Sequence, residues 1–241
     1  MTSPPPWRRS VTASEVVIRR ADEADAHALA AVHLTSRRAA AMPPPAHTDS
    51  EVRAWLAGRL RHDEVWVAEA GGAAAAYVRL TEDWLDDLYV LPERTRQGIG
   101  SALLDLAKQQ RPGGFCLWVF EQNETARAFY RRHRLVELEH TDGSANEERA
   151  RDVRMAWPGT DPLGFLRRLI DDVDHQLGEL LARRAALTAA VQPHKPAAER
   201  DPEREREIAV RMAALAPALG EERLTRIVHA IITESLDAAG H

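Results

Sequence analysis

The chain has 241 residues, of which 44% are hydrophobic and 29% are charged, with a net charge of −5. This length predicts one large domain or two small ones, and the net charge shows no overall nucleic-acid-binding footprint. Its one cysteine, Cys116, excludes an internal disulfide and fits a reducing cytoplasm. The proline-rich start has no secretory apolar stretch, and no apolar run approaches the roughly 18 residues that span a bilayer. We therefore expect a cytoplasmic protein that binds neither nucleic acid nor membrane.

The chain divides into two parts with different hydrophobic patterns. Short strand patterns alternate with helical patterns over residues 15–157, whereas only helical periodicity remains from residue 163 onward. The cluster Pro158-Gly159-Thr160-Asp161-Pro162 lies between them and is typical of a linker. We predict a disordered N-terminus over 1–14, a mixed α/β domain over 15–157, a linker over 158–162 and an all-α domain over 163–241.

The elements of the first part follow in chain order. A strand over 16–19 precedes a helix that Asp22 could cap, and Ser50 could cap a second helix. A hairpin is predicted over 64–70 and 74–80, turning at Gly71-Gly72. Further strands are predicted over 85–91, 115–120, 135–139 and 152–157, with helices over 101–110 and 124–133.

Between a predicted strand and a predicted helix stands the turn Gln97-Gly98-Ile99-Gly100. Two glycines let backbone N–H groups approach a ligand closely, and the following helix N-terminus favours a pyrophosphate. The turn is no P-loop, because no Gly-Lys-Ser/Thr follows, and Leu103 replaces the third glycine of the dinucleotide fingerprint. A helix start built from small residues is the alternative explanation of this turn.

The flanking residues make this turn more specific. The run Leu88-Tyr89-Val90-Leu91-Pro92-Glu93, with Gln97-Gly98-Ile99-Gly100-Ser101-Ala102-Leu103-Leu104 after it, resembles the acetyl-CoA motif of the GNAT acetyltransferases. Downstream, Leu117-Trp118-Val119 followed by Asn123, Ala126, Phe129 and Tyr130 resembles the second motif of that family. The resemblance covers residues 15 to 157 and implies a GNAT fold with acetyl-CoA as its cosubstrate.

The resemblance also implies roles for individual residues. The pantetheine arm would lie at splayed strands near Leu91 and Trp118, and Asn123 would contact CoA. Tyr130 would return a proton to the thiolate leaving group, as general acid catalysis requires. The pyrophosphate would be held by the backbone N–H groups of Gln97, Gly98, Ile99, Gly100 and Ser101.

The sequence departs from the family at Thr95, where Gln or Arg is frequent, and at Arg134, where a glycine is expected. For the general base, Asp86 or Asp87 could serve directly or through water, although both could equally be solvent-facing carboxylates on a strand. The acyl acceptor does not follow from the pattern, because a fold does not determine its substrate.

The second part predicts three helices. Leucine, isoleucine and valine recur at spacings of three and four over 163–194, which predicts one very long helix. Asp201-Pro202-Glu203 is a typical helix start, and that helix should run to about Leu219 before Gly220 ends it. A third helix is predicted over 222–238. A helix of about 30 residues is about 45 Å long, so burying its apolar stripe predicts a homodimer.

Three cations of this part are related by helix geometry. Arg184 and Lys195 are 11 residues apart, close to three whole turns, and therefore share a helix face. Arg167 precedes Arg184 by 17 residues, which separates the two by about 25 Å along one straight helix. One small ligand can contact all three only if Arg167 comes from a second chain, and solvated surface cations are the alternative explanation.

The surrounding pattern is similar to the AroQ-type, or type II, chorismate mutases. Leu166-Arg167, Ile170-Asp171, Val173-Asp174, Leu177, Leu180-Leu181 and Arg184 resemble the first helix of that family. Its continuation is matched by Val191, Lys195, Asp201 and Arg204-Glu205, and its last helix by Ile231-Ile232 and Ser235. The resemblance covers residues 163 to 239 and implies an intertwined dimer that rearranges chorismate to prephenate, a shikimate-pathway step toward aromatic amino acids, without cofactor or metal.

The resemblance implies a site of cations around a dicarboxylate. Arg184, together with Arg167 of the partner, would bind the two carboxylates, since guanidinium groups bind carboxylates bidentately. Lys195 would stabilise the charge that grows on the ether oxygen. Arg204 and Ser235 would assist at the carboxylates, while Asp201 and Glu205 would meet the substrate hydroxyl or orient the cations.

One departure leaves alternatives open. The family usually has Gln or Glu four residues after Ser235, as a second donor to the ether oxygen, and here Ala239 takes that place. A lost transition-state donor typically costs about 10²–10³ in rate. The site could therefore be slow, need an activating partner, or act on 4-amino-4-deoxychorismate or as an isochorismate pyruvate-lyase. A dimerisation or regulatory module for the first part is the non-catalytic alternative.

Overall fold

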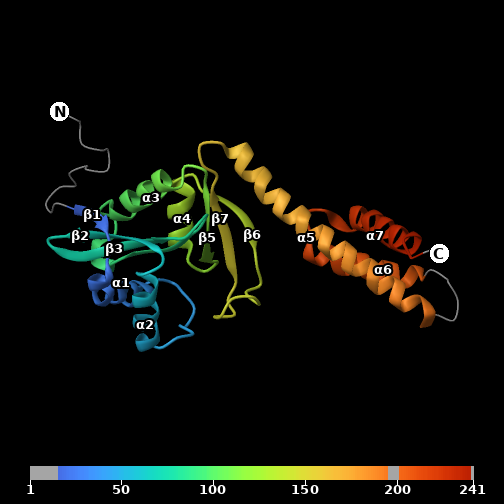
Figure 1. Ribbon diagram of the computed structural model, residues 1–241, viewed down its shortest axis with the longest axis horizontal. Coiled ribbons are helices and arrows are strands. Elements are labelled where there is room, and N and C mark those ends of the chain that lie inside the picture. The colour runs from blue at the N-terminus through green and yellow to red at the C-terminus, as the bar shows by residue number, and fades with distance from the viewer. Residues whose placement is uncertain (1–15, 195–200, 240–241) are drawn as a thin grey trace. The chain divides into compact units, whose positions relative to one another are not determined.

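The computed structural model describes residues 16–194 and 201–239. These residues form two compact units, which divide between Leu166 and Arg167. The first is a mixed α/β unit with antiparallel sheets, and the second consists of helices alone (Figure 1). In the described part of the chain, no helix is both long and apolar enough to cross a membrane.

Two antiparallel sheets form the frame of the first unit. The four-stranded sheet has the order β1-β2-β3-β4, and the three-stranded sheet has the order β5-β7-β6. The predicted hairpin at Gly71-Gly72 is confirmed as β2 and β3. The strands span Val16–Arg20 (β1), Glu64–Ala70 (β2), Ala73–Leu80 (β3), Leu85–Val90 (β4), Phe115–Phe120 (β5), Val136–His140 (β6) and Asp152–Trp157 (β7).

Helices cover both faces of the four-stranded sheet (Figure 1). The helices α1 and α2 bury Leu29 and Leu56 against one face, and α3 buries Leu103 and Leu104 against the other. The helices of this unit span Glu23–Asp25 (η1), Ala26–Ala39 (α1), Asp49–Arg59 (α2), Pro92–Arg94 (η2), Ile99–Gln110 (α3) and Glu124–Arg132 (α4).

Two predicted helix caps differ in the structure. Asp22 caps the short helix η1 rather than α1, because its carboxylate accepts a hydrogen bond from the Ala24 N–H at 2.8 Å. Ser50 was the wrong cap for α2. Thr48 caps it, and the Glu51 carboxylate accepts a 2.8 Å hydrogen bond from the Thr48 N–H. A threonine followed three residues later by a glutamate satisfies two helix donors at once, which Ser50 cannot do.

A β-bulge interrupts β4 at Asp86. Leu80 pairs with Leu85, but Arg79 pairs with Asp87, so Asp86 is an extra residue on this strand. A bulge bends its strand and re-aims the side chains beside it, and bulges are frequent next to active sites. The bulge therefore brings two successive carboxylates opposite a single arginine.

The second unit is built from α5 (Pro162–Val191), η3 (Gln192–His194), α6 (Pro202–Leu215) and α7 (Gly220–Asp237). Asp201 is confirmed as the cap of α6, because Oδ1 accepts from the N–H groups of Glu203 and Arg204. The predicted end of α6 near Leu219 was wrong. The helix ends at Leu215, since Pro217 disfavours helical backbone at the residue before it. Gly220 begins α7 instead of ending α6.

The first turn of α5 belongs to the core of the first unit. Phe165 is only 4% exposed, and its ring lies so close to Gly114 that a Cβ at that glycine would collide with it. The Thr160 N–H also donates to the Pro112 carbonyl at 3.0 Å. Pro162, assigned above to the linker, is the first residue of α5. Along the chain, the boundary between the two compact units falls after Leu166.

The long helix α5 leaves an apolar stripe exposed in the single chain. Within the described second unit, only Ala209, Leu224, Val228 and Ser235 are buried. Large apolar side chains of α5 are instead between 37% and 61% exposed; they are Ile170, Val173, Leu177, Leu180, Leu181, Leu187 and Val191. A continuous apolar surface of this kind marks an interaction site.

Candidate active sites

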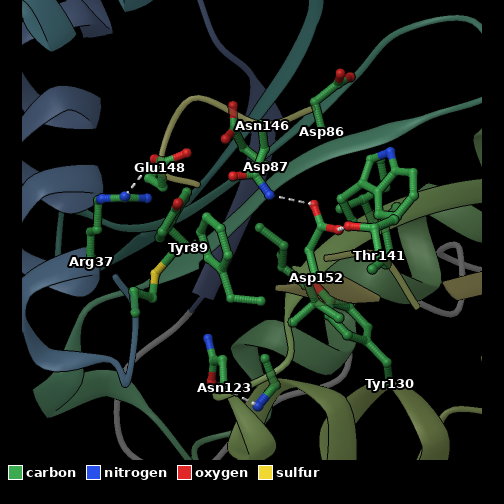
Figure 2. A pocket seen from close by; sticks show the side chains of 18 of the residues that line it. Arg37, Asp86, Asp87, Tyr89, Asn123, Tyr130, Thr141, Asn146, Glu148 and Asp152 are labelled. Atoms are coloured by element: carbon green, nitrogen blue, oxygen red, sulfur yellow. Dashed lines mark hydrogen bonds and ion pairs between the residues drawn. The ribbon is translucent and has the colours of Figure 1, made fainter. Parts of the chain in front are cut away.

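A cavity of about 460 Å³ opens in the first unit where β4 and β5 part. Figure 2 shows Asn123 and Tyr130 in one part of it and Asp86 and Asp87 in another. The loop between β6 and β7 supplies a further wall. The polar and aromatic lining residues are Arg37, Asp86, Asp87, Tyr89, Trp118, Phe120, Asn123, Tyr130, Thr141, Asn146, Glu148 and Asp152.

The two carboxylates at the bulge have different surroundings. Asp87 is buried and accepts a 2.5 Å hydrogen bond from Nε of Arg79, whose Nη1 also donates to Asp63 at 2.7 Å. The Asp86 side chain is 25% exposed and lies 3.7 Å from the same guanidinium. It accepts a 2.9 Å bond from the Thr81 hydroxyl. Burial raises the pKa of Asp86 above its ordinary range, although Arg79 and Thr81 oppose that shift.

Tyr130 and Asn123 both line this cavity, as their predicted roles require. Burial raises the pKa of the Tyr130 phenol far above neutral, so the hydroxyl keeps its proton at neutral pH. Asn123 caps α4, where its side-chain oxygen accepts a 3.2 Å bond from the Ala126 N–H. Cys116 lies outside this lining, and burial raises the pKa of its thiol.

The predicted pyrophosphate turn lies at the start of α3. Gly98 adopts the left-handed φ of 83° that an L side chain resists, and the next N–H groups begin the helix without intrahelical acceptors. The Ile99 side chain is buried, so only its backbone can meet a ligand. A Cβ at Gly100 would lie 3.5 Å from Val90 and 3.7 Å from Phe129. The turn thus lies against the end of β4 and against α4.

The other predicted residues of the turn make local contacts. The Gln97 amide donates to the Glu93 carbonyl at 2.9 Å, and the Ser101 hydroxyl lies 3.0 Å from Nε2 of His133. The Leu91 N–H donates to the Ala75 carbonyl at 2.9 Å. Leu91 and the residues from Gln97 to Ser101 are absent from the lining of the cavity. Of the residues predicted for this domain, the lining contains Asp86, Asp87, Trp118, Asn123 and Tyr130.

Sequence reasoning missed the cavity wall formed by the loop 141–151. Nη2 of Arg37, on α1, lies 2.7 Å from the Glu148 carboxylate of this loop. The Asp152 carboxylate accepts from the Thr141 hydroxyl and from the Asn146 amide (Figure 2). These contacts join residues from distant parts of the sequence, and no local spacing signals them.

A second cavity, of about 370 Å³, lies among the three helices of the second unit. It brings together four of the predicted mutase residues, Arg184, Asp201, Arg204 and Glu205. Its other lining residues are Leu187, Thr188, Val191, Gln192, Ile208, Ile232 and Leu236. Thr188 and Gln192 follow Arg184 at four-residue intervals, so helical spacing alone could have found them.

Polar contacts orient the cations of this cavity. Nη1 of Arg184 donates to the Ser235 hydroxyl at 2.8 Å, which joins α5 to α7. The Arg204 guanidinium lies 3.3 Å from the Glu207 carboxylate, an exposed pair of little energetic weight. Oε2 of Glu205 lies 3.8 Å from Nδ1 of His229.

Arg167 and Lys195, both predicted for the mutase site, are not among the described residues that line this cavity. Arg167 is exposed and does not line the cavity of its own chain, as expected from its distance of about 25 Å from Arg184 along the helix. Lys195 lies outside the described residues.

Comparison with known families assigns both regions. The family model of the acetyltransferase (GNAT) domain matches residues 61–133, and the model of chorismate mutase type II matches residues 166–239. The chain therefore carries a GNAT acetyltransferase domain followed by a type II chorismate mutase domain. This order of domains confirms the resemblances drawn from the sequence.

Individual relatives support the first assignment. A probable N-acetyltransferase of Mycobacterium tuberculosis, Rv2775, is 35% identical over 74 residues, which are 27% of this chain and 42% of that protein. The chain thus spans less than half the length of that relative. Apo YjaB of Escherichia coli shares the fold with a TM-score of 0.51 at 21% identity, over 60% of this chain and 99% of that one. A GCN5-related N-acetyltransferase from Rhodopseudomonas palustris gives 0.51 at 19%, over 59% and 94%.

Proposed function

We propose that the chain is a bifunctional enzyme. The second unit, as a dimer, rearranges chorismate to prephenate, and the first unit transfers an acetyl group from acetyl-CoA to an amine. The observation that carries the mutase proposal is the cavity in which Arg184, Arg204 and Glu205 converge from two helices.

The rearrangement needs little from the protein except positioning and charge. One carbon–oxygen bond breaks while one carbon–carbon bond forms, and no proton is transferred. Arg184 and Arg204 bind a carboxylate of the substrate, and the Ser235 hydroxyl holds the Arg184 guanidinium at 2.8 Å before the substrate arrives. Lys195 stabilises the developing negative charge on the ether oxygen. Such preorganised electrostatic contacts supply much of the rate enhancement of enzymes.

A second copy of the chain completes this site. The exposed apolar stripe of α5 needs a partner, and pairing with a second α5 buries it. Arg167 of the second copy then reaches the second carboxylate, which Arg167 of the same chain cannot do along one helix. A two-fold symmetric pair has two such sites.

Acetyl transfer in the first unit is a direct attack on the thioester. The amine nitrogen bonds to the thioester carbonyl carbon, the carbon–sulfur bond breaks, and the CoA thiolate leaves. Tyr130 gives its phenolic proton to that thiolate, and a base takes the proton from the amine. Cys116 does not act as an intermediate nucleophile, because it is buried and its raised pKa keeps it as a thiol.

Asp86 is the base of this transfer rather than Asp87. Asp87 is held by Arg79 at 2.5 Å and is only 8% exposed, so a proton on it would weaken a buried ion pair. Asp86 is more exposed and lies farther from the guanidinium. Its raised pKa makes it a stronger base than an ordinary aspartate.

Two assays on the full chain test the proposal. Incubation with chorismate should give prephenate, and incubation with acetyl-CoA and amines should release CoA. A folded protein that gives no prephenate excludes the mutase, and one that does not bind acetyl-CoA at millimolar concentration excludes the acetyltransferase.

Ala239 favours a second candidate reaction for the second unit. Its methyl group supplies no hydrogen bond to the ether oxygen, and it follows Leu236, a cavity residue, by three positions, just beyond the end of α7. The same assay therefore includes 4-amino-4-deoxychorismate and isochorismate, with pyruvate release as the readout for a lyase. A kcat/KM at least about tenfold higher than with chorismate, equal to about 1.4 kcal/mol, would reassign the substrate.

A further inference from the structure

The acetyltransferase cavity contains more carboxylates than its own cations neutralise. Asp86, Asp87, Glu148 and Asp152 line it, and Arg37 is the single cationic lining residue in the described part of the chain. Arg37 is engaged by Glu148 at 2.7 Å. The lining therefore keeps an excess of negative charge.

At the bulge of β4, one guanidinium serves three carboxylates. Arg79 lies 2.5 Å from Asp87, 2.7 Å from Asp63 and 3.7 Å from Asp86. Asp63 also lies 3.9 Å from the Arg59 guanidinium, so three carboxylates face two guanidiniums and leave a formal charge of −1. Asp86 has the most distant contact of the three and the most exposed side chain. It is therefore the carboxylate most able to meet a ligand.

Asp152, at the start of β7, is a second unneutralised carboxylate. Its two oxygens accept hydrogen bonds from the Thr141 hydroxyl and from the Asn146 amide. Both donors are uncharged, so they fix the direction of the carboxylate without cancelling its charge. Within residues 16–194 and 201–239, no ion pair of Asp152 is found within 4.0 Å.

An aromatic side chain of the same lining also suits a cation. Trp118 on β5 lines the same cavity and is 44% exposed despite its size. The face of an indole ring attracts ammonium groups. Asp86 comes from β4 of the four-stranded sheet and Asp152 from β7 of the three-stranded sheet, so each belongs to a different wall of the cavity.

We propose that the acyl acceptor is an amine that carries a second, positively charged group. The amino group that reacts lies at Asp86, and the second cation lies at Asp152 beside Trp118. This inference rests on the acetyltransferase function proposed above. It also separates the two activities, because the dicarboxylate substrate and product of the second unit have the wrong charge for this cavity.

Three acceptors of equal length test the proposal with the full chain. They are 1,5-diaminopentane, pentylamine and 5-aminopentanoate, which differ only in a cationic, neutral or anionic far end. CoA release gives kcat/KM for each one. The diamine should exceed the monoamine by at least about tenfold, and the aminocarboxylate should be the poorest of the three. Equal values for the diamine and the monoamine, or a preference for the aminocarboxylate, would overturn the proposal.

The substitution Asp152→Asn tests whether Asp152 binds the second cation of the acceptor. It keeps acceptor oxygen for Thr141 and removes the charge. It should raise KM for the diamine about tenfold, with kcat and the values for pentylamine little changed. Asp142→Asn, in the same loop but outside the cavity lining, is the matched control and should keep the preference for the diamine. An unchanged preference in Asp152→Asn would contradict the assignment.

Calorimetry separates this inference from the function on which it rests. Failure to bind acetyl-CoA would overturn the acetyltransferase itself. If acetyl-CoA binds but none of the three amines reacts, the same amines are titrated into the CoA-loaded protein. Tighter binding of the diamine supports the proposal, and equal binding or no binding overturns it.

Discussion

The two units of this chain differ in how far a single chain buries their apolar side chains. Every Trp, Tyr and Phe of the sequence precedes residue 167, and the first unit buries large side chains such as Tyr77 and Phe115 in its own core. The second unit has no aromatic residue and leaves the apolar stripe of α5 exposed. In the function proposed above, the first unit contains its whole active site, whereas the second needs another copy of the chain to cover this stripe and to complete its site.

The strongest way to break this comparison is Arg184→Ala. Loss of a preorganised cation should lower the rate of prephenate formation by about 100-fold or more, with acetyl-CoA affinity unchanged. Arg183→Ala is the matched control, since Arg183 is exposed and absent from the cavity lining. Steady-state kinetics measure prephenate formation and calorimetry measures acetyl-CoA affinity for both variants. A similar loss of rate in Arg183→Ala would refute the assignment of Arg184 to the mutase site.

The substitution Asp86→Asn tests the proposed acetyltransferase site, which a single chain is expected to complete. Loss of a general base should lower kcat of acetyl transfer by about 10²-fold. In the wild type, activity should fall as the pH drops through the pKa of Asp86, which lies above its ordinary value of 3.8, and the variant should lose this acidic limb. Asp83→Asn, an exposed aspartate of the preceding turn, should keep the wild-type pH profile. An unchanged profile in Asp86→Asn means that another group is the base.

Mixed dimers sharpen the contrast between a one-chain and a two-chain site. Arg167→Ala and Arg184→Ala should each be inactive in prephenate formation. After subunit exchange between equal amounts, half the dimers are mixed and each holds one intact site of two, so about a quarter of the wild-type activity should return. Activity that stays at the level of the single variants would show that each chain builds its own site.

A smaller effect, on acetyl-CoA affinity, is expected from a substitution in the glycine turn at the start of α3. Gly98→Ala places a methyl group at φ 83°, which distorts the turn and should weaken acetyl-CoA binding about tenfold. Gly71→Ala is a matched control, because Gly71 also has a positive φ, of 65°, in the hairpin between β2 and β3. Both variants should lose similar stability by thermal unfolding, and only Gly98→Ala should lose affinity in calorimetry.

The smallest expected effect concerns a buried histidine. Nδ1 of His33 lies 2.8 Å from the Tyr77 hydroxyl, and burial lowers the pKa of His33 below 6.5. The neutral ring therefore stabilises the first unit above pH 6.5, and this contribution is lost as the pH falls. In His33→Gln, which does not titrate, the loss of unfolding free energy between pH 7.5 and 5 should be smaller by about 1 kcal/mol.

Tryptophan fluorescence measures this effect in one unit alone, because all six tryptophans precede residue 167. Far-UV circular dichroism follows the helices of both units in the same samples. A pH dependence equal to that of the wild type would exclude His33 as the titrating group.

Local patterns predicted much of this architecture. Alternating hydrophobic residues located the strands, and Asp201 was confirmed as a helix cap because its signal lies within three residues. The predicted end of α6 was wrong because the hydrophobic pattern continues past Pro217, whereas the proline disfavours helical backbone at the residue before it. The wall of the first cavity depends on pairs such as Arg37 with Glu148, which are 111 residues apart in the sequence. Such a pair depends on the tertiary fold and has no local spacing.

The bulge at Asp86 limited the prediction in another way. Strict alternation would place Asp86 and Asp87 on opposite faces of β4, so the sequence offered no basis for choosing a base between them. The register shift beside Arg79 brings both to the same arginine, and their different exposure then distinguishes them.

The position of Phe165 determines where this fusion can be separated or recombined. A chain cut at residue 160 would remove a phenyl ring from beneath Gly114, and loss of such a side chain costs about 3–5 kcal/mol. A cut after Leu166 keeps that ring and still leaves Arg167 with the helices. Exchange of either domain for another should therefore use a junction inside the first turns of α5, although the proline and glycine residues before this helix are typical of a linker.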